Sequence, residues 1–470
     1  MVRARHIIVA NIFAALAGCA EVGPNYHVPA KAIVNAPAAN GAFVSGGSAV
    51  SDAPLPDHWW HLFNDPVLDG LVQKALDDNV DLKVAQANLE RSKALVAEIR
   101  TNRDVIVSAQ AGTGYAQFSA EAFLQGERPP EFEFYNIGLT ASYDLDLFGG
   151  IRRGIEAASA EDEAVEAARD LVRVNVAAET TRAYSDLCNA GHEIDVLHRL
   201  IAVETKDLAM TKELTSHGRA AAFEDQRQQS VIEGSRSQLP TLQARQLNAA
   251  FRLATLTGQP PENYDRSWLT CHQPLQLTTS LPTGDGRALL KRRPDVRAAE
   301  RQLAAATASI GIATAELYPD IKLTGSVGST GVGSNFLSPL TNRFYVGPEI
   351  NWNLHRDAIR DRIDAATAQS RASLAKFDST VLSALRETET SLDAYAKSLD
   401  QLQTLESARD KTREVSDKTN ELWRGGRVGG IVALDAEKTW VAADAAVAAA
   451  QAQVNTDQIS AFLALGGGWQ

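Results

Sequence analysis

The sequence predicts a mixed α and membrane-β protein, in which each chain combines four long strands with very long coiled-coil helices. Residues 135–147 alternate apolar with small or polar side chains, which is typical of a strand with one apolar face. That length exceeds the usual soluble strand and suits a bilayer-spanning strand of ~9–11 residues. Most of the remaining chain has helical periodicity, and its two halves repeat the same order of elements.

The composition favours closely packed helices and argues against nucleic acid as a partner. The chain has 470 residues, of which 44% are hydrophobic but only 6% aromatic, and its formal net charge is −12. Many small alanine side chains and few aromatic ones favour long helices that approach one another closely. An acidic chain repels the phosphate backbone of nucleic acid.

Residues 1–18 form a predicted signal peptide, because two arginines precede an apolar run too short to span a bilayer. The run ends at Cys19 in Leu-Ala-Gly-Cys, which resembles the lipobox of bacterial lipoproteins, where this cysteine carries the lipid. An ordinary signal peptide with a chance cysteine is the alternative. Ala20 points to the outer membrane by the usual sorting rule for such lipoproteins. Residues 19–67, rich in proline, glycine and serine, are then a lipidated N-terminal arm rather than a domain.

Three further stretches have the alternation of strands, and the four pair by position along the chain. Strands at about 105–118 and 132–147 form one predicted hairpin, and strands at about 320–330 and 342–355 form a second. A polar loop with glycine or proline joins the strands of each pair, as a hairpin requires.

The longest helices are predicted at 150–217 and 356–424, where apolar residues recur at spacings of three and four. An earlier helix runs from Leu68 to about Arg100, and Asp65-Pro66 provides its start signal. Each long helix ends in a glycine-bearing turn, and the same periodicity then predicts a return helix of ~35–40 residues.

The chain is an internal duplication. The turns at Gly218 and Gly426 lie 208 residues apart, and at the same offset Ile194 matches Leu402 and Leu197 matches Leu405. The domain boundaries follow from this repeat: a first structural repeat at 68–258, an equatorial linker at 259–285 and a second structural repeat at 286–470.

Four strands cannot close a barrel in lipid, because an open sheet leaves unpaired backbone groups at a cost of several kcal/mol each. The chain therefore has to oligomerise. Two, three or four copies would give eight, twelve or sixteen strands. An eight-stranded barrel is filled by side chains, whereas a larger barrel leaves a lumen.

Ordered motifs cover nearly the whole chain and resemble those of TolC-type outer membrane factors, in the lipoprotein branch with OprM-like and NodT-like proteins. Besides the lipobox, they are Gly23-Pro24-Asn25-Tyr26, Trp59-Trp60, Phe63-Asn64-Asp65-Pro66, Arg293-Pro294-Asp295-Val296, Leu434-Asp435-Ala436 and Leu465-Gly466-Gly467-Gly468-Trp469. One departure is visible at Arg103-Asp104-Val105, where the family often enters the first hairpin with an apolar residue and proline.

The resemblance implies a homotrimer with a twelve-stranded outer-membrane β-barrel, continued by a twelve-helix α-barrel through the periplasm. It also implies a passive channel that takes drugs or other small molecules from a periplasmic adaptor and an inner-membrane pump to the exterior. A periplasmic coiled-coil adaptor lipoprotein is the alternative reading. Four strands with a lipid-facing side weigh against it, because an adaptor has no use for such a surface.

The helix-tip turns at Gly218 and Gly426 are expected to meet the adaptor. The resemblance implies a periplasmic gate there, made of an apolar and an acidic ring, and its positions match Ile431 and Asp435. These residues are four apart on one helix and so share a face. The alternative is that Ile431 packs in the coiled coil and Asp435 only decorates a helix start. Glu224 and Arg427 are candidates for a tip latch.

The sequence contains none of the common hydrolase, metalloprotease or nucleotide-binding motifs, so we expect neither an enzyme nor a bound metal or cofactor. Cys188 and Cys271 are the remaining thiols once Cys19 is lipidated. In an oxidising compartment they would either form a disulfide or stay as two separate buried thiols.

Overall fold

The computed structural model describes residues 21–117, 119–121 and 126–467, so the predicted lipidation at Cys19 lies outside the described residues. The chain divides into two compact units, and both repeats contribute to each. The first unit consists of Met1–Pro29, Leu89–Val165 and Ala298–Phe377, and the second consists of Ala30–Asn88, Glu166–Arg297 and Asp378–Gln470.

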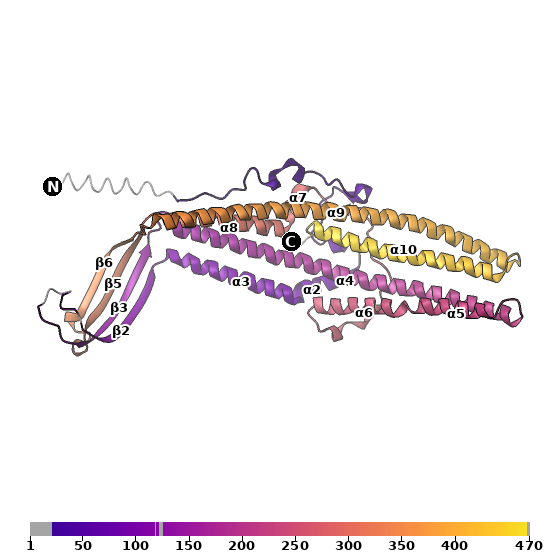
Figure 1. Cartoon of the computed structure of the whole chain (residues 1–470), viewed down its shortest axis with the longest axis horizontal. Helices are drawn as coiled ribbons and strands as arrows, with labels where there is room; N and C mark the ends of the chain where they lie inside the picture. The colour runs from indigo at the N-terminus through magenta and orange to yellow at the C-terminus, as the bar shows by residue number, and fades with distance from the viewer. Residues whose placement is uncertain (1–20, 118, 122–125, 468–470) are drawn as a thin grey trace. The chain divides into compact units, whose positions relative to one another are not determined.

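The first unit contains a four-stranded antiparallel sheet with the strand order β2-β3-β5-β6 (Figure 1). Its strands are β2 (Ile106–Ala116), β3 (Phe132–Asp144), β5 (Asp320–Val332) and β6 (Asn342–Asn351). Both predicted hairpins are confirmed, and pairing of β3 with β5 joins them into one sheet.

Two predicted strands extend too far at the ends that lead into helices, and beyond each strand a side chain accepts from backbone N–H groups instead of continuing the sheet. β3 ends at Asp144 because Asp146 turns away and caps the next helix, where its carboxylate accepts from the backbone N–H of Ile151 (2.8 Å) and Arg152 (3.0 Å). β6 ends at Asn351, since Asn353 accepts from the backbone N–H two residues further on.

The two long helices are confirmed as α4 (Gly150–Ser216, 67 residues) and α9 (Arg356–Arg424, 69 residues). At 1.5 Å per residue each is ~100 Å long. α8 (Pro294–Ala315) leads into β5, and the short α7 (Gly286–Arg292) precedes it. None of the helices in the described residues has an apolar run long enough to span a bilayer.

Two helices predicted as continuous are broken. The first is split into α2 (Pro66–Asp78) and α3 (Val80–Arg100) at the buried Asn79, whose amide donates to the carbonyl of Leu256 at 3.0 Å and accepts from the N–H of Leu82 at 3.1 Å. The predicted cap at Asp65 is confirmed, because its carboxylate accepts from the N–H groups of the first turn.

The first return helix is likewise split, into α5 (Phe223–Arg236) and α6 (Leu239–Leu256), next to Pro240, which lacks a backbone N–H. The second return helix, α10 (Gly430–Ala464), is unbroken over 35 residues, within the predicted length.

From Ala30 onward the arm belongs to the second unit, as does the linker. This part of the arm begins with three short 3-10 helices, η1 (Ile33–Asn35), η2 (Pro37–Ala39) and η3 (Gly47–Ala49). The strand β1 (Val50–Ser51) follows and pairs in parallel with β4 (Leu281–Pro282) of the linker. η4 (Trp59–Phe63) then places Trp59 in the core, stacked on Phe462 with ring centroids 4.4 Å apart. The linker also contains η7 (Pro261–Asn263) and η8 (Arg266–Thr270).

Of the two alternatives for the thiols, the structure has the disulfide. Cys188 on α4 is bonded to Cys271 in the linker, with their Cα atoms 4.8 Å apart and a sequence separation of 83. A bond that closes a loop of this length stabilises the fold by ~4.5 kcal/mol in the chain-entropy account. It fixes the linker to the long helix.

The two helix-tip turns have the same backbone geometry, as the repeat predicts. Gly218 and Gly426 have φ of 69° and 71°, and the residue after each donates its N–H to the carbonyl five residues before it, at 2.8 and 2.9 Å. This is the glycine-ended helix cap in which a left-handed residue reverses the chain.

Replacing either turn glycine should therefore destabilise its tip for a purely conformational reason, since a Cβ at either position would have open space around it. We expect Gly218→Ala or Gly426→Ala to cost ~1 kcal/mol, measured as a lower unfolding midpoint. The matched control is Gly429→Ala, where space is also open but φ is −73°. That variant should be neutral or slightly stabilising, and an equal loss at all three positions would contradict this account.

Candidate channel and gate surfaces

One face of the sheet is apolar and exposed in the single chain. Residues that face one another across the strands share a face, and the apolar rows include Ala111 with Ile137, Val107 with Ala141, and Val327 with both Leu139 and Phe344. Phe344 is 84% exposed and Val346 is 75% exposed. Large apolar side chains in such a patch mark an interaction surface, and their spacing over the strands suits lipid.

The other face is polar and internally hydrogen-bonded. One row across the sheet joins Ser108, Thr140, Ser326 and Tyr345. Arg343 lies in the next row and donates to Asn136 at 2.9 Å and to Thr330 at 3.0 Å. An aqueous lumen lined by such groups would solvate them, as in porin-like barrels.

The sheet has two open edges. In the order β2-β3-β5-β6, β2 and β6 each pair on one side only among the described strands. The other side of each is a row of backbone N–H and C=O groups that water can satisfy but hydrocarbon cannot. The apolar face and the open edges therefore become compatible only when further strands pair with both edges.

The predicted gate residues both lie on the exposed side of α10, near its start. Ile431 is 41% exposed and Asp435 is exposed, whereas Ala433 and Leu434 between them are buried. The predicted shared face is therefore present. The gating role itself stays a prediction.

Among the described residues of one chain, Glu224 and Arg427 do not form the predicted latch. Glu224 instead pairs with Arg227 of the same helix at 2.8 Å. Around the second tip, Gly430 packs tightly, because a Cβ on it would lie 2.4 Å from the methyl group of Met210 on α4. The start of α10 is thus fixed against α4 by a close contact rather than by Arg427.

A seam between α4 and α10 is the main feature that was not predicted. Its buried residues recur every seven positions on both helices and run antiparallel, with Val196 and Val203 on α4 facing Leu434, Val441 and Ala448 on α10. This is the knobs-into-holes spacing of a coiled coil. The heptad was visible in the sequence, but the identity of the partner helix was not.

Polar pairs interrupt this seam at two places. Asn455 donates to Asn189 at 3.0 Å, and both side chains are buried. Lys438 pairs with Asp207 at 3.1 Å, and the aspartate side chain is only 4% exposed. The exposed flank carries complementary charges seven residues apart on each helix: Arg199 with Asp444, and Lys206 with Glu437.

A second carboxylate shares this buried site. Ser235 of α5 donates to one oxygen of Glu204 at 3.0 Å, and the other oxygen has no partner among the described residues. Burial raises the pKa of Glu204, and the neighbouring Asp207 raises it further, against the opposing effects of Ser235 and Lys438.

Removing only the cation of the buried pair should destabilise the seam strongly. We expect Lys438→Met to lower the free energy of unfolding by ~3 kcal/mol, because two buried carboxylates, Asp207 and Glu204, lose the cation beside them. Combining it with Asp207→Leu should restore most of the loss, measured by guanidinium denaturation. The exposed pair is the control: Arg199→Gln should cost ~1 kcal/mol or less. A double variant as unstable as Lys438→Met would contradict the pairing.

Glu204 should make stability depend on pH. Since its pKa is raised in the folded state, folding is favoured at low pH, and this advantage is lost as pH rises through the folded pKa. Glu204→Gln keeps the acceptor for Ser235 without the charge. It should raise the unfolding midpoint at pH 7, and the gain should vanish as pH falls below the ordinary value of 4.5. Glu233→Gln, on an exposed side chain of α5, should show no such pH-dependent gain.

Comparison with known proteins agrees with these surfaces. The family of outer membrane efflux proteins matches residues 71–259 and 286–467. The toluene efflux pump outer membrane protein TtgC of Pseudomonas putida is 27% identical over 466 residues, which cover 97% of this chain and 93% of that protein. The probable outer membrane lipoprotein SilC of Salmonella typhimurium is 26% identical over 480 residues and covers both chains fully.

The solved structure of the outer-membrane channel OprN is similar throughout, with a TM-score of 0.85 and 32% identity over 95% of this chain and 99% of that one. These likenesses exclude the alternative of a periplasmic adaptor. The chain belongs to the outer membrane efflux protein family and is an efflux channel of the outer membrane that extends into the periplasm.

Proposed function

We propose that three copies of this chain form a passive channel, with a twelve-stranded barrel in the outer membrane and a twelve-helix tunnel below it. The open sheet with one apolar face carries this proposal, because both of its edges need partner strands. Two copies would give eight strands and a filled barrel, whereas three give twelve and leave a lumen. The polar face with Arg343, Thr140 and Ser326 would line that lumen.

We further propose that the channel works with a periplasmic adaptor and an inner-membrane pump, which deliver drugs or other small molecules to it. The exposed apolar side chains at the tips support a docking role, and they include Phe223, Trp423 and Val432. Cys19 would carry a lipid as a second hold on the membrane.

Ile431 and Asp435 are the proposed gate. Three copies of Asp435 around one axis would repel one another and attract cations, and three copies of Ile431 would form a dry constriction. A latch between Glu224 and Arg427 would then have to join neighbouring protomers, since within one chain Glu224 pairs with Arg227.

The test is made on purified protein in a planar bilayer. We expect a trimer by mass in mild detergent, and we expect Ile431→Ala with Asp435→Ala to raise single-channel conductance and weaken block by multivalent cations. The control is Val231→Ala with Glu233→Ala, on exposed positions of α5, which should leave both quantities unchanged.

A stable folded monomer would refute the channel. Unchanged conductance and unchanged block in the gate variant would remove Ile431 and Asp435 from the gate but leave the trimer standing.

A further inference from the structure

The first described residues of the arm lie on the turn between β3 and α4. The N–H of Val22 donates to the carbonyl of Phe148 at 3.2 Å. Gly149 next to it has φ of 79°, and a Cβ there would lie 2.8 Å from the side chain of Glu21. The arm therefore packs directly on this strand–helix turn, within the first unit.

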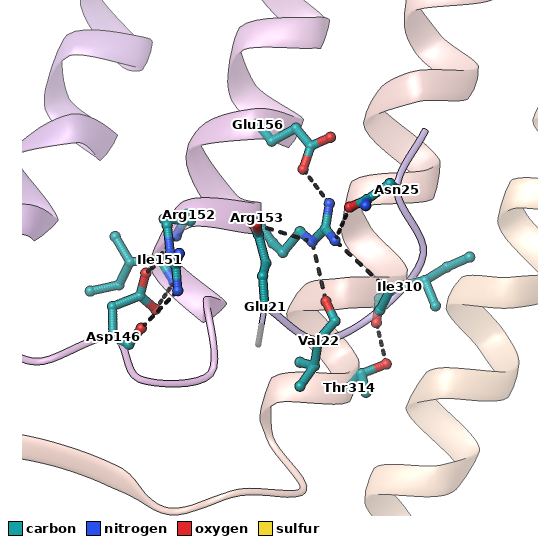
Figure 2. A network of polar contacts seen from close by, with 11 residues as sticks. Glu21, Val22, Asn25, Asp146, Ile151, Arg152, Arg153, Glu156, Ile310 and Thr314 are labelled. Carbon is teal, nitrogen blue, oxygen red and sulfur yellow. Dashed lines mark hydrogen bonds and ion pairs between the residues drawn. The ribbon is translucent and has the colours of Figure 1, made fainter. Parts of the chain in front are cut away.

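Arg153, on the first turn of α4, forms the centre of this contact (Figure 2). Its side chain is only 2% exposed, and its guanidinium donates to three groups of the arm: the carbonyl of Val22 at 3.2 Å, the carbonyl of Gly23 at 3.4 Å and the side chain of Asn25 at 2.7 Å. Glu156 of the same helix accepts at 2.6 Å, and Glu21 lies 3.5 Å away. The arm thus supplies most of the hydrogen-bond acceptors of the buried, permanently charged guanidinium group.

α8 of the second repeat contacts the other side of the arm. The space between the start of α4 and α8, which holds arm residues 21–26, is called the socket below. A Cβ on Gly311 would lie 2.7 Å from the stem of Arg153, and a Cβ on Gly23 would lie 2.5 Å from the Cα of Gly311. The arm backbone therefore runs in contact with the α8 backbone, and only glycine fits on either side.

The end of the socket is closed by Tyr26. Its hydroxyl donates to Glu300 at 2.9 Å, and Arg301 lies over its ring. Burial raises the pKa of Tyr26, and the carboxylate of Glu300 beside it raises it further, so the phenol stays protonated and remains a donor.

Aromatic side chains mark the same junction as a membrane boundary. Phe148 stacks on Tyr318 with ring centroids 4.4 Å apart, and the indole of Trp352 donates to the carbonyl of Leu317 at 3.1 Å. Aromatic residues gather at the membrane–water interface of β-barrels. Strands of 10 to 13 residues are long enough to cross the outer membrane, so their helix-side ends lie at its periplasmic surface.

We propose that Arg153 is the positioning residue for the acylated N terminus. Cys19 precedes Glu21 by two residues in the sequence. By holding residues 21–26 in the socket, Arg153 confines the lipid to the membrane beside the strand–helix junction. This rests on the proposed acylation of Cys19. Without the arm, Arg153 would be a buried charge with Glu156 as its remaining partner, so the socket and the arm stabilise each other.

A spin label at the exposed position 27, introduced by His27→Cys, tests the docking in purified trimer. No other thiol reacts, because Cys188 and Cys271 form a disulfide and Cys19 is acylated. We expect an immobilised spectrum in the labelled parent and loss of the immobilised component with Arg153→Met. Asn25→Ala, which changes only the arm, should shift the spectrum in the same direction. The control Arg360→Met removes an exposed arginine of α9, and the spectrum should not change.

An immobilised label in both Arg153→Met and Asn25→Ala would overturn the proposal, and Asn25→Ala alone decides if Arg153→Met does not fold. Repeating the measurement with Cys19→Ser should give the same docked spectrum, because the socket contacts do not include the lipid. Mass spectrometry of the parent tests acylation separately. A conducting trimer with a mobile label in the parent would refute the socket and leave the proposed channel intact.

Discussion

The open edges of the four-stranded sheet are the constraint on which the rest of the molecule depends. β2 and β6 each leave one side unpaired, and such groups cost several kcal/mol each in hydrocarbon. The apolar face on Phe344 and Val346 nevertheless requires a membrane. The apolar face can lie in a membrane only if further strands pair with both edges. One copy of the chain therefore cannot form a closed barrel. The duplication helps, because each half contributes one hairpin and pairing of β3 with β5 leaves just two edges to close.

In this chain the sheet passes directly into helices, and β3 changes to α4 within a few residues. Asp146 ends the strand and caps the helix with the same carboxylate. Arg153, one turn later, gathers carbonyls from a distant part of the chain. The junction is therefore held by a cluster of charge-assisted hydrogen bonds as well as by the stacked rings of Phe148 and Tyr318.

Periodicity predicted the strands and the long helices because both depend on local spacing, and the bounds of α9 agree with the expected 356–424. It failed where a distant group decides the local structure. Asn79 breaks a helix through the carbonyl of Leu256, 177 residues away. Within one chain Glu224 pairs with Arg227, and the latch with Arg427 stays a prediction. The gate positions share an exposed face as expected, but which surface they line depends on neighbouring copies.

The seam between α4 and α10 shows why buried polar pairs remain in so apolar a setting. An interface of apolar side chains that recur every seven residues discriminates poorly between registers, since a slip of seven residues, ~10 Å, would again place apolar side chains opposite one another. Such a slip would separate Asn189 from Asn455 and leave Asp207 buried without Lys438. The free-energy cost of leaving a buried polar group unpaired exceeds the net free energy gained when it is paired. The two pairs therefore destabilise every register but one. Helices of this length need that penalty, because in the proposed channel the turns at Gly218 and Gly426 would have to lie at the same level to form one periplasmic end.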